Sequence, residues 1–258
     1  MSTDYFSSPG LSFHQLKDLA TVSPRYYQRR HVTKEIADGD RDALRLGRLV
    51  HLAVLEPAIF ADVPQVPGEH LTPSGGLSTK AATREWQAQL TGRDYGTPDE
   101  LELCRQLQAA VRGHSLARLI LDQSQVEVET RWDRDGVACK AKADIIRAPS
   151  REIPGEVWDL KTTRRLDGIV RECREYGYAE QLAWYADAYQ VAVGGLIVVE
   201  KEPPHRVLII QFDVDVIAQA RERVASWLGL YRACLESGQW PNDPPNAHLI
   251  TAAELGAA

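Results

Sequence analysis

The sequence predicts an α/β protein in which a mixed β-sheet is flanked by helices and preceded by an N-terminal helical elaboration. Residues 1–124 carry apolar side chains at helical spacing. From residue 125 the spacing changes to strict alternation, which is typical of half-buried strands. After residue 163, helical and strand-like segments follow one another, as they do where helices connect the strands of one sheet.

Capping signals place the N-terminal helices. Ser12 with Gln15 forms a capping box ahead of an apolar run. Thr97 and Glu100 form another. With the apolar spacing, these signals predict helices over residues 13–20, 24–30, 40–57, 78–90, 97–114 and 115–122, where Pro57 ends the third and a Pro/Gly-rich loop covers 63–76.

The alternating segments predict a three-stranded meander with a hairpin turn at 134–136. On its first strand, Val126, Val128 and Trp132 are expected on one face. On its second strand, every other residue from Val137 to Ile145 is expected on one face. The strands are expected over 125–132, 137–147 and 157–163, followed by helices over 165–177 and 178–193, strands over 195–201 and 205–214, and a helix over 215–237. We expect one domain over 1–240, mainly helical to 124 with the sheet and its helices over 125–240, and a Pro-rich tail over 241–258.

The composition bounds the class of protein. Apolar residues make up 44% and charged residues 26%, as in ordinary globular proteins. No run is long enough to span a bilayer and no signal-peptide pattern begins the chain, so a cytoplasmic protein without a membrane partner is expected. The cysteines are scattered, which argues against a zinc site or an iron–sulfur cluster; they are Cys104, Cys139, Cys173 and Cys234.

The net charge of −6 argues weakly against a nucleic-acid partner, but the local field at a groove matters more than the total. Arginine supplies 23 of the 30 cationic residues, and its planar fork suits phosphate. The arginines gather in clusters that would suit a nucleic-acid surface, although solvated helix faces explain each one equally well; they include Arg25, Arg29, Arg30, Arg45, Arg48, Arg164 and Arg165.

The stretch "VWDLKTT" carries the first candidate chemistry. Residues two apart on a strand share a face, so Asp159 and Lys161 do. A surface ion pair is the plain interpretation. Asp144 lies on the polar side of the preceding strand, and if the two strands pair or splay at their ends, Asp144 and Asp159 converge. Two close carboxylates repel unless a cation lies between them, and Mg²⁺ prefers such oxygen ligands.

Two helices add further candidates. Gly47 and His51 stand at i and i+4 on a largely apolar helix. The imidazole needs a polar partner there, which a carboxylate or a metal-bound water would supply. On the helix over 178–193, Gln181 and Tyr185 stand at the same spacing and offer a bridging amide and a stacking or donating ring. Taken singly, each residue has a plain structural explanation.

The order of these motifs resembles the PD-(D/E)XK nuclease superfamily, and within it the exodeoxyribonuclease VIII family of prophage recombination exonucleases. The similarity covers roughly residues 11–240 and rests on the stretches "LSFHQLKDLATVSPRYY", "LGRLVHLAVLEPAIF", "GVACKAKADII", "VWDLKTT" and "YGYAEQLAWYADAY". The acid before the signature lysine is Asp rather than Glu, which the family pattern allows. The cysteines do not fit the iron–sulfur branch of related nucleases.

The resemblance implies roles by position. It implies metal ligation by His51, Asp144 and Asp159, with Lys161 as the signature lysine. It also implies an extra acid on the preceding strand, Glu127, with Glu129 as a competitor. The implied catalytic set is Lys161, Asp159, Asp144, Glu127, His51 and Gln181. Candidate DNA contacts are Tyr185, Thr162, Thr163, Arg164 and Arg48.

The resemblance further implies Mg²⁺-dependent hydrolysis of linear double-stranded DNA from its ends, 5′→3′, with 3′ overhangs for recombination. Mn²⁺ is expected to replace Mg²⁺, and no iron–sulfur cluster is expected. A homo-oligomeric ring (trimer or tetramer) and a single-strand annealing protein are the implied partners. The competing hypotheses are an endonuclease or repair nuclease of the same fold, a non-catalytic DNA-binding module, and an α/β domain whose acids form surface ion pairs.

Overall fold

The computed structural model describes residues 5, 8–37, 42–149 and 154–242. A five-stranded mixed sheet lies at its centre, with the strands in chain order from β1 to β5. The strands are β1 (Ser124–Arg134), β2 (Val137–Arg147), β3 (Glu156–Thr163), β4 (Ala192–Glu200) and β5 (Val207–Ile210). The predicted meander is confirmed, because β1, β2 and β3 pair antiparallel. β3 pairs parallel with β4, so the sheet is mixed as predicted.

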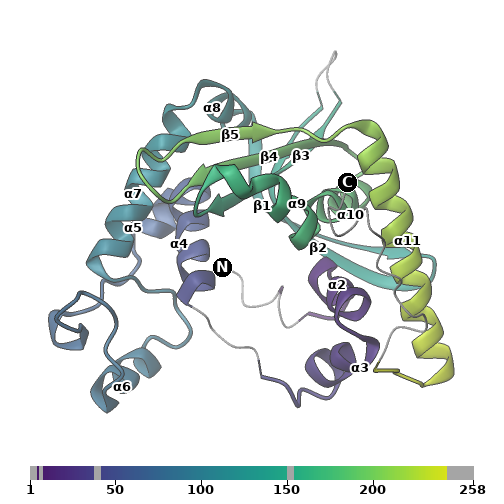
Figure 1. Ribbon diagram of the computed structural model, residues 1–258, viewed down its shortest axis with the longest axis horizontal. Coiled ribbons are helices and arrows are strands. Elements are labelled where there is room, and N and C mark those ends of the chain that lie inside the picture. Colours follow the sequence, from purple (N-terminus) through teal and green to yellow (C-terminus); the bar gives the residue numbers. More distant parts are fainter. Residues whose placement is uncertain (1–4, 6–7, 38–41, 150–153, 243–258) are drawn as a thin grey trace, which may run out of the picture.

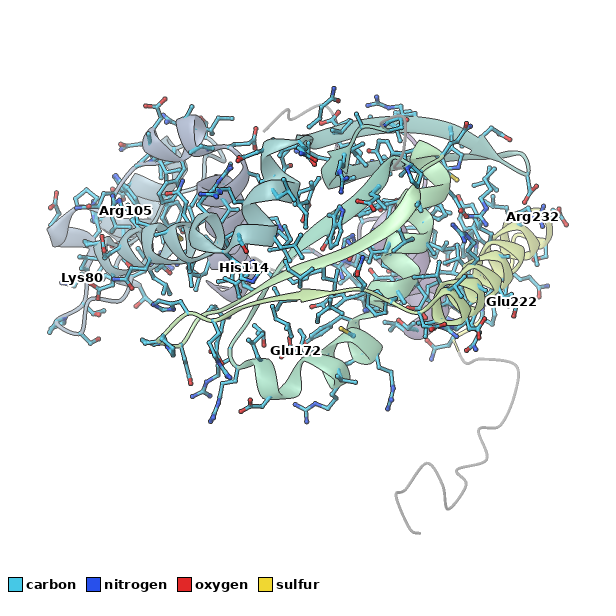
Figure 2. All side chains as sticks on the ribbon, turned by 90° about the horizontal axis from the view of Figure 1, so that it is seen from above. Lys80, Arg105, His114, Glu172, Glu222 and Arg232 are labelled. Carbon is cyan, nitrogen blue, oxygen red and sulfur yellow. The ribbon has the colours of Figure 1, made fainter. Side chains whose placement is uncertain are left out.

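Helices cover both faces of the sheet (Figure 1). On one face, α10 (Tyr178–Tyr189) and α11 (Val214–Ser237) pack with α2 (Phe13–Thr21) around a core that includes Trp184 and Leu196. On the other face, α4 (Asp42–Leu55), α7 (Pro98–Gly113) and α8 (Ser115–Asp122) pack around Leu160 and Ile197. Figure 2 shows Lys80 and Arg105 at one end of the molecule and Glu222 and Arg232 at the other.

The capping signals are confirmed. Both predicted capping boxes form, at Ser12 before α2 and at Thr97 before α7. The remaining helical segments are α3 (Pro24–Tyr27), η1 (Gln28–Val32), α5 (Pro57–Ala61), η2 (Gly68–His70), α6 (Ala81–Gln89), η3 (Leu166–Gly168) and α9 (Ile169–Tyr176). Pro57 ends α4 as expected but also begins α5, because proline fits the first turn of a helix.

Several predicted boundaries are wrong by three or more residues, and the ends of α10 and β5 are examples. The helix predicted over 178–193 ends at Tyr189, where Gln190 adopts a left-handed conformation with φ 55°, and residues 192–193 already belong to β4. β5 is shorter than predicted, at Val207–Ile210. Of the tail predicted over 241–258, only Pro241 and Asn242 are described; the Pro241 carbonyl accepts a hydrogen bond from the Arg25 amide at 3.0 Å.

The face assignment of the first two strands is wrong at one point. Val126 and Ile145 pack in the core beneath α4 and α7, whereas Trp132, Val137 and Ala143 pack in the core on the α10 side. On β1 the faces exchange at Glu127, which has a φ of 53°. A left-handed residue in a strand re-aims the side chains that follow it.

The remaining sequence features are simply placed. Asp135 and Gly136, with φ values of 53° and 80°, form the predicted hairpin turn. In the described part of the chain, no helix is both long enough and apolar enough to cross a membrane. Three cysteines are buried and Cys173 is partly buried; the buried ones are Cys104, Cys139 and Cys234.

Candidate active site

The candidate site lies where β2 and β3 part. Their recorded pairing runs from Arg147 opposite Glu156 to Ile145 opposite Trp158. Asp144 is the residue of β2 next to Ile145, just beyond the end of this pairing. Its Oδ2 accepts a hydrogen bond of 2.9 Å from the Leu160 amide. The Asp144 side chain therefore bonds to the β3 backbone where the strands separate. Asp144 also lies close enough to Asp159 for its charge to raise the pKa of Asp159.

His51 reaches Asp144 from α4, on the opposite side of the sheet from α10. Its Nε2 lies 3.0 Å from Asp144 Oδ2, and its Nδ1 lies 2.9 Å from the Gly47 carbonyl oxygen. An Nδ1–H donated to that carbonyl directs Nε2 toward the acid, as histidines that ligate metals usually require. A Cβ at Gly47 would meet nothing within 4 Å, so the space beside the imidazole is open.

Asp159 and Lys161 share the α10 face of β3, as predicted. The Lys161 ammonium lies 2.5 Å from Asp159 Oδ2 and 4.8 Å from the centre of the Tyr178 ring. The Asp159 side chain is 1% exposed. Although it contacts the ammonium, its Oδ2 receives no well-angled hydrogen bond among the described groups. A buried carboxylate oxygen without a proper donor is rare and suits a cation.

The acids of the site perturb one another. Burial, and then the charge of Asp144, raise the pKa of Asp159 to about 6 against the opposing effect of Lys161. Burial alone would lower the pKa of His51, but the charge and hydrogen bond of Asp144 raise it to about 9. Burial would likewise raise the pKa of Asp144, yet the His51 charge holds it below its ordinary value. Such opposed shifts within one cluster are typical of functional sites.

Glu127 lies across from Asp144 in the register of β1 and β2, in which Val126 pairs with Ile145 and Val128 with Ala143. Burial, and then the charge of Asp144, raise its pKa. Glu129 instead stands opposite Lys142. The electrostatic coupling therefore favours Glu127 over Glu129 as the extra acid.

The helix α10 covers the site on its other side. Gln181 and Tyr185 are buried, and the Gln181 amide donates to the Tyr185 hydroxyl at 3.1 Å. Burial, and then the charges of Asp159 and Asp144, raise the pKa of Tyr185. These two side chains therefore line the acid cluster, and their amide and hydroxyl groups already bond to each other.

Sequence reasoning missed three residues here. The Tyr189 hydroxyl accepts from the Ala143 amide and donates to the Val128 carbonyl, and so supports the backbone beside Asp144 and Glu127. Its signal was present, since Gln181, Tyr185 and Tyr189 continue one i+4 row. Tyr178 contacts Lys161. His14 on α2 is exposed, but desolvation and then Lys161 lower its pKa to about 4, which indicates that it lies near the site.

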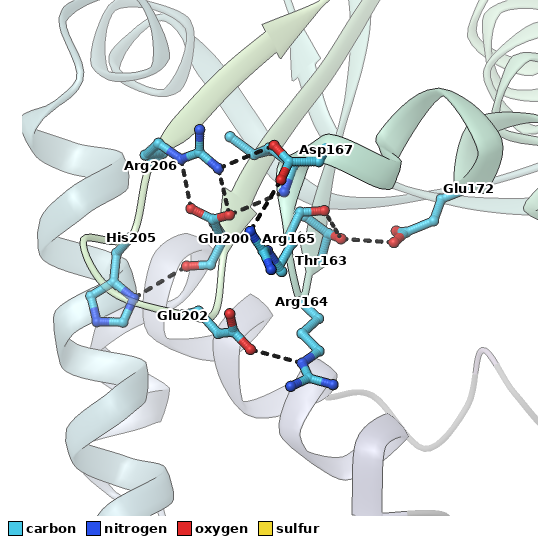
Figure 3. A network of polar contacts seen from close by, with 10 residues as sticks. Thr163, Arg164, Arg165, Asp167, Glu172, Glu200, Glu202, His205 and Arg206 are labelled. Atoms are coloured by element: carbon cyan, nitrogen blue, oxygen red, sulfur yellow. Dashed lines mark hydrogen bonds and ion pairs between the residues drawn. The ribbon is translucent and has the colours of Figure 1, made fainter.

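The candidate DNA contacts that follow Lys161 in the chain differ in how exposed their side chains are. Thr163 is buried, and its hydroxyl donates to Glu172 at 2.8 Å and to the Arg165 carbonyl at 3.1 Å, so it shapes the loop rather than presenting a donor (Figure 3). Thr162 is partly buried. The Arg164 side chain is 83% exposed although it pairs with Glu202. Arg164 thus retains the exposure that a DNA contact needs.

The arginines of α4 also divide. Arg48 pairs with Asp94 at 2.9 Å, and its side chain is 39% exposed. Arg45, expected as a candidate for a basic surface, is instead 3% exposed and forms two hydrogen bonds of 2.7 Å with Glu100. The prediction of a surface role for Arg45 is therefore wrong. Its planar guanidinium is instead buried between α4 and α7, where it bonds Glu100 through two nitrogens.

The residues present suit a divalent cation. The cluster offers carboxylates from β2 and β3, an imidazole with its second nitrogen anchored, and the undonated Oδ2 of Asp159, which together form a hard-cation donor set. Among the described residues, no three His, Cys, Asp or Glu side chains yet converge on a single point. Each acid instead lies against a protein cation: Asp144 against His51 at 3.0 Å, Glu127 against Lys142 at 2.7 Å, and Asp159 against Lys161 at 2.5 Å.

Together, the sheet order, the acid-bearing strands and the lysine two residues after Asp159 define a domain of the PD-(D/E)XK class. A model of the family described as "PDDEXK-like domain of unknown function (DUF3799)" matches residues 12–252, and the chain belongs to that family. The predicted superfamily is therefore confirmed. No curated protein matches the chain.

Solved structures agree with the fold. A candidate exonuclease from Eubacterium rectale superposes with a TM-score of 0.65 at 14% identity, covering 100% of this chain and 98% of that chain. At this identity the likeness shows a shared fold. A phage-related exonuclease from Haemophilus somnus 129PT matches at 16% identity over 74% of this chain and 95% of that chain, but its TM-score of 0.34 is too low to add to the fold assignment.

Proposed function

We propose that the protein is a Mg²⁺-dependent exodeoxyribonuclease that hydrolyses phosphodiester bonds of linear double-stranded DNA. The observation that carries the proposal is the convergence of Asp144 and Asp159 where β2 and β3 part, with Lys161 2.5 Å from Asp159. A domain that only binds DNA has no use for paired carboxylates facing a phosphate, because they repel it. The family fold and the fold shared with the Eubacterium rectale protein support the same class.

Asp144, Asp159 and His51 would hold the metal ion, with Glu127 as a further ligand. The ion, when bound, polarises the scissile phosphate and lowers the pKa of the attacking water. Lys161 is placed to orient that water and to stabilise negative charge on the phosphate. Tyr178 keeps the Lys161 ammonium over its ring, 4.8 Å from the centroid. The Gly47 carbonyl fixes the orientation of the His51 ring.

The finer features of the proposal come from the family resemblance: 5′→3′ digestion, 3′ overhangs for recombination, a ring of three or four copies around the duplex, and an annealing partner. Mn²⁺ is proposed to replace Mg²⁺, and a cytoplasmic location follows from the proposed substrate. A protein with a net charge of −6 must gather its cations locally to track DNA. Arg48 and Arg164 are the exposed candidates for that surface.

The test uses duplexes of identical sequence in linear and closed circular form. Linear DNA is labelled at either 5′ end, with or without 5′ phosphate, and incubated with the protein in Mg²⁺, Mn²⁺ or EDTA. The proposal predicts metal-dependent shortening of linear DNA from the 5′ end and no cutting of the circle. Cleavage of the circle would indicate an endonuclease, and retention of DNA without cleavage in Mg²⁺ would indicate a binding module. Either result contradicts the proposal.

A further inference from the structure

Lys142 on β2 forms an ion pair that sequence reasoning did not connect with the site. Its ammonium lies 2.7 Å from Oε2 of Glu127, and the two side chains are 12% and 17% exposed. An ion pair this enclosed is not a solvated surface contact, because both charges have lost most of their water. Breaking it without a replacement cation would leave Glu127 charged and unpaired.

The backbone directs Glu127 toward the site while Lys142 occupies its carboxylate. Glu127 adopts a left-handed conformation that few non-glycine residues take within a strand. Such strain persists only where the surroundings enforce it, and it is common at functional sites. The Tyr189 hydroxyl provides that enforcement by bonding the Val128 carbonyl. The result is an acid across from Asp144 whose charge is balanced by a protein cation.

The cluster as a whole is balanced in this way. Three acids face three cations: Glu127 faces Lys142, Asp144 faces His51, and Asp159 faces Lys161. This pairing explains why no three described ligands converge on one point, although the donor types suit a divalent ion. Lys161 and His51 have roles in the proposed reaction, whereas Lys142 has none. The ion pair of Lys142 is the one with Glu127 at 2.7 Å, so among the described contacts its charge balances that acid.

We propose that Lys142 is an internal counter-ion that occupies the Glu127 carboxylate, so that its ammonium and a divalent cation compete for the same carboxylate. This proposal rests on the proposed function and concerns how that site admits its metal ion. Lys142 is thus a positioning residue that weakens metal binding and stabilises the metal-free fold. Its flexible four-carbon chain allows the ammonium to withdraw once a metal ion replaces it.

The experiment compares metal binding by the wild-type protein and by Lys142→Met, which keeps the length of the side chain and removes its charge. Mg²⁺ binding is measured by calorimetry, Mn²⁺ binding by the electron paramagnetic resonance of the free ion, and the metal-free Tm by thermal unfolding. Lys142→Arg keeps the charge. Arg147→Met is the matched control, because Arg147 lies on the same strand and pairs with Glu156 at 17% and 18% exposure. Circular dichroism verifies that each variant folds.

Lys142→Met is expected to bind Mn²⁺ about tenfold more tightly than wild type, to have a lower metal-free Tm, and to regain stability on metal addition. Lys142→Arg and Arg147→Met should keep the wild-type affinity, and Glu127→Gln should abolish the gain when combined with Lys142→Met. Equal or weaker Mn²⁺ binding by Lys142→Met overturns the inference while leaving the proposed function standing. If neither wild type nor Lys142→Met binds Mn²⁺ or Mg²⁺, both the inference and the proposed function fail.

Discussion

Two clusters of charged side chains lie along β3 and just beyond it. The first gathers around Asp144 and Asp159, and the second around Glu200, where β3, β4 and the loop before α9 meet (Figure 3). Both central acids are nearly inaccessible, since Asp159 is 1% and Glu200 is 3% exposed. Burial alone therefore does not distinguish them.

The clusters differ in how completely their groups are bonded. Glu200 accepts two hydrogen bonds of 2.8 Å from Arg206 and one of 3.1 Å from the Leu166 amide. The hydrogen bonds from Arg206, above all, lower the pKa of Glu200 to about 2. Burial and Asp144 instead raise the pKa of Asp159 to about 6, and its Oδ2 lacks a well-angled donor among the described groups. The Glu200 cluster fixes a loop, whereas the acids around Asp144 and Asp159 raise and lower one another's pKa values, which is typical of a functional site.

The largest effect should come from breaking the acid cluster around Asp144 and Asp159. Asp159→Asn should lower turnover of linear duplex DNA by at least about a thousandfold, because it removes a metal ligand. The Tm should stay the same or rise, since the repulsion between Asp159 and Asp144 disappears. Rates come from a labelled-duplex assay and Tm from thermal unfolding. Turnover at the wild-type rate would mean that the site has been assigned wrongly.

The second-largest loss of turnover should come from replacing Lys161. Lys161→Met should lower turnover about 10²- to 10³-fold, as does the loss of a group that stabilises transition-state charge. Lys161→Arg should recover only part of this loss, because the planar guanidinium does not reproduce a point charge. If Lys161→Arg binds Mn²⁺ with wild-type affinity, its loss of turnover reflects a role of Lys161 in the reaction and not in metal binding. A neutral effect of Lys161→Met on turnover would contradict the account.

The Glu200 cluster should show the reverse behaviour. Glu200→Gln should lower the Tm, because it weakens the hydrogen bonds by which the Leu166 amide and the Arg206 side chain hold Glu200. Turnover per folded molecule should stay near that of wild type. Arg206→Met should have the same effect, and the double variant should be less damaging than the sum of the two. A large loss of turnover at an unchanged Tm would show that this cluster takes part in the reaction.

The smallest expected effect is a pH dependence of stability. Asp144 raises the pKa of His51 from 6.5 to about 9, so the stabilisation by protonated His51 is complete below pH 6.5 and is lost as pH rises through about 9. The free energy of unfolding of the metal-free protein should fall by about 3 kcal/mol over that range. Denaturant titrations from pH 6 to 10 measure it. His51→Gln should abolish this component, and an equal slope in that variant would contradict the assignment.

The sequence was most informative where structure is local. The capping boxes at Ser12 and Thr97 form because each needs only residues three apart, and the same-face relation of Asp159 and Lys161 follows from strand geometry. The sequence also indicated that the imidazole of His51 needs a polar partner, and the structure places Asp144 against it.

What the sequence could not supply depends on contacts between distant segments. The exchange of faces at Glu127 interrupts an alternation that looks regular, and Tyr189 of α10 supports it from more than fifty residues away in the chain. The burial of Arg45 depends on Glu100, 55 residues later. The pairing of Lys142 with Glu127 depends on the same irregular backbone. In each case tertiary contacts decided between placements that the local pattern left equal.

The central claim is that the acid cluster around Asp144 and Asp159 binds a divalent cation, whereas the Glu200 cluster is structural. The most direct measurement is the shift in Tm that Mn²⁺ produces in wild type, Asp159→Asn and Glu200→Gln, titrated to saturation. The account predicts the same apparent Kd for wild type and Glu200→Gln, and a shift that is lost or greatly weakened in Asp159→Asn. An undiminished shift in Asp159→Asn would contradict it.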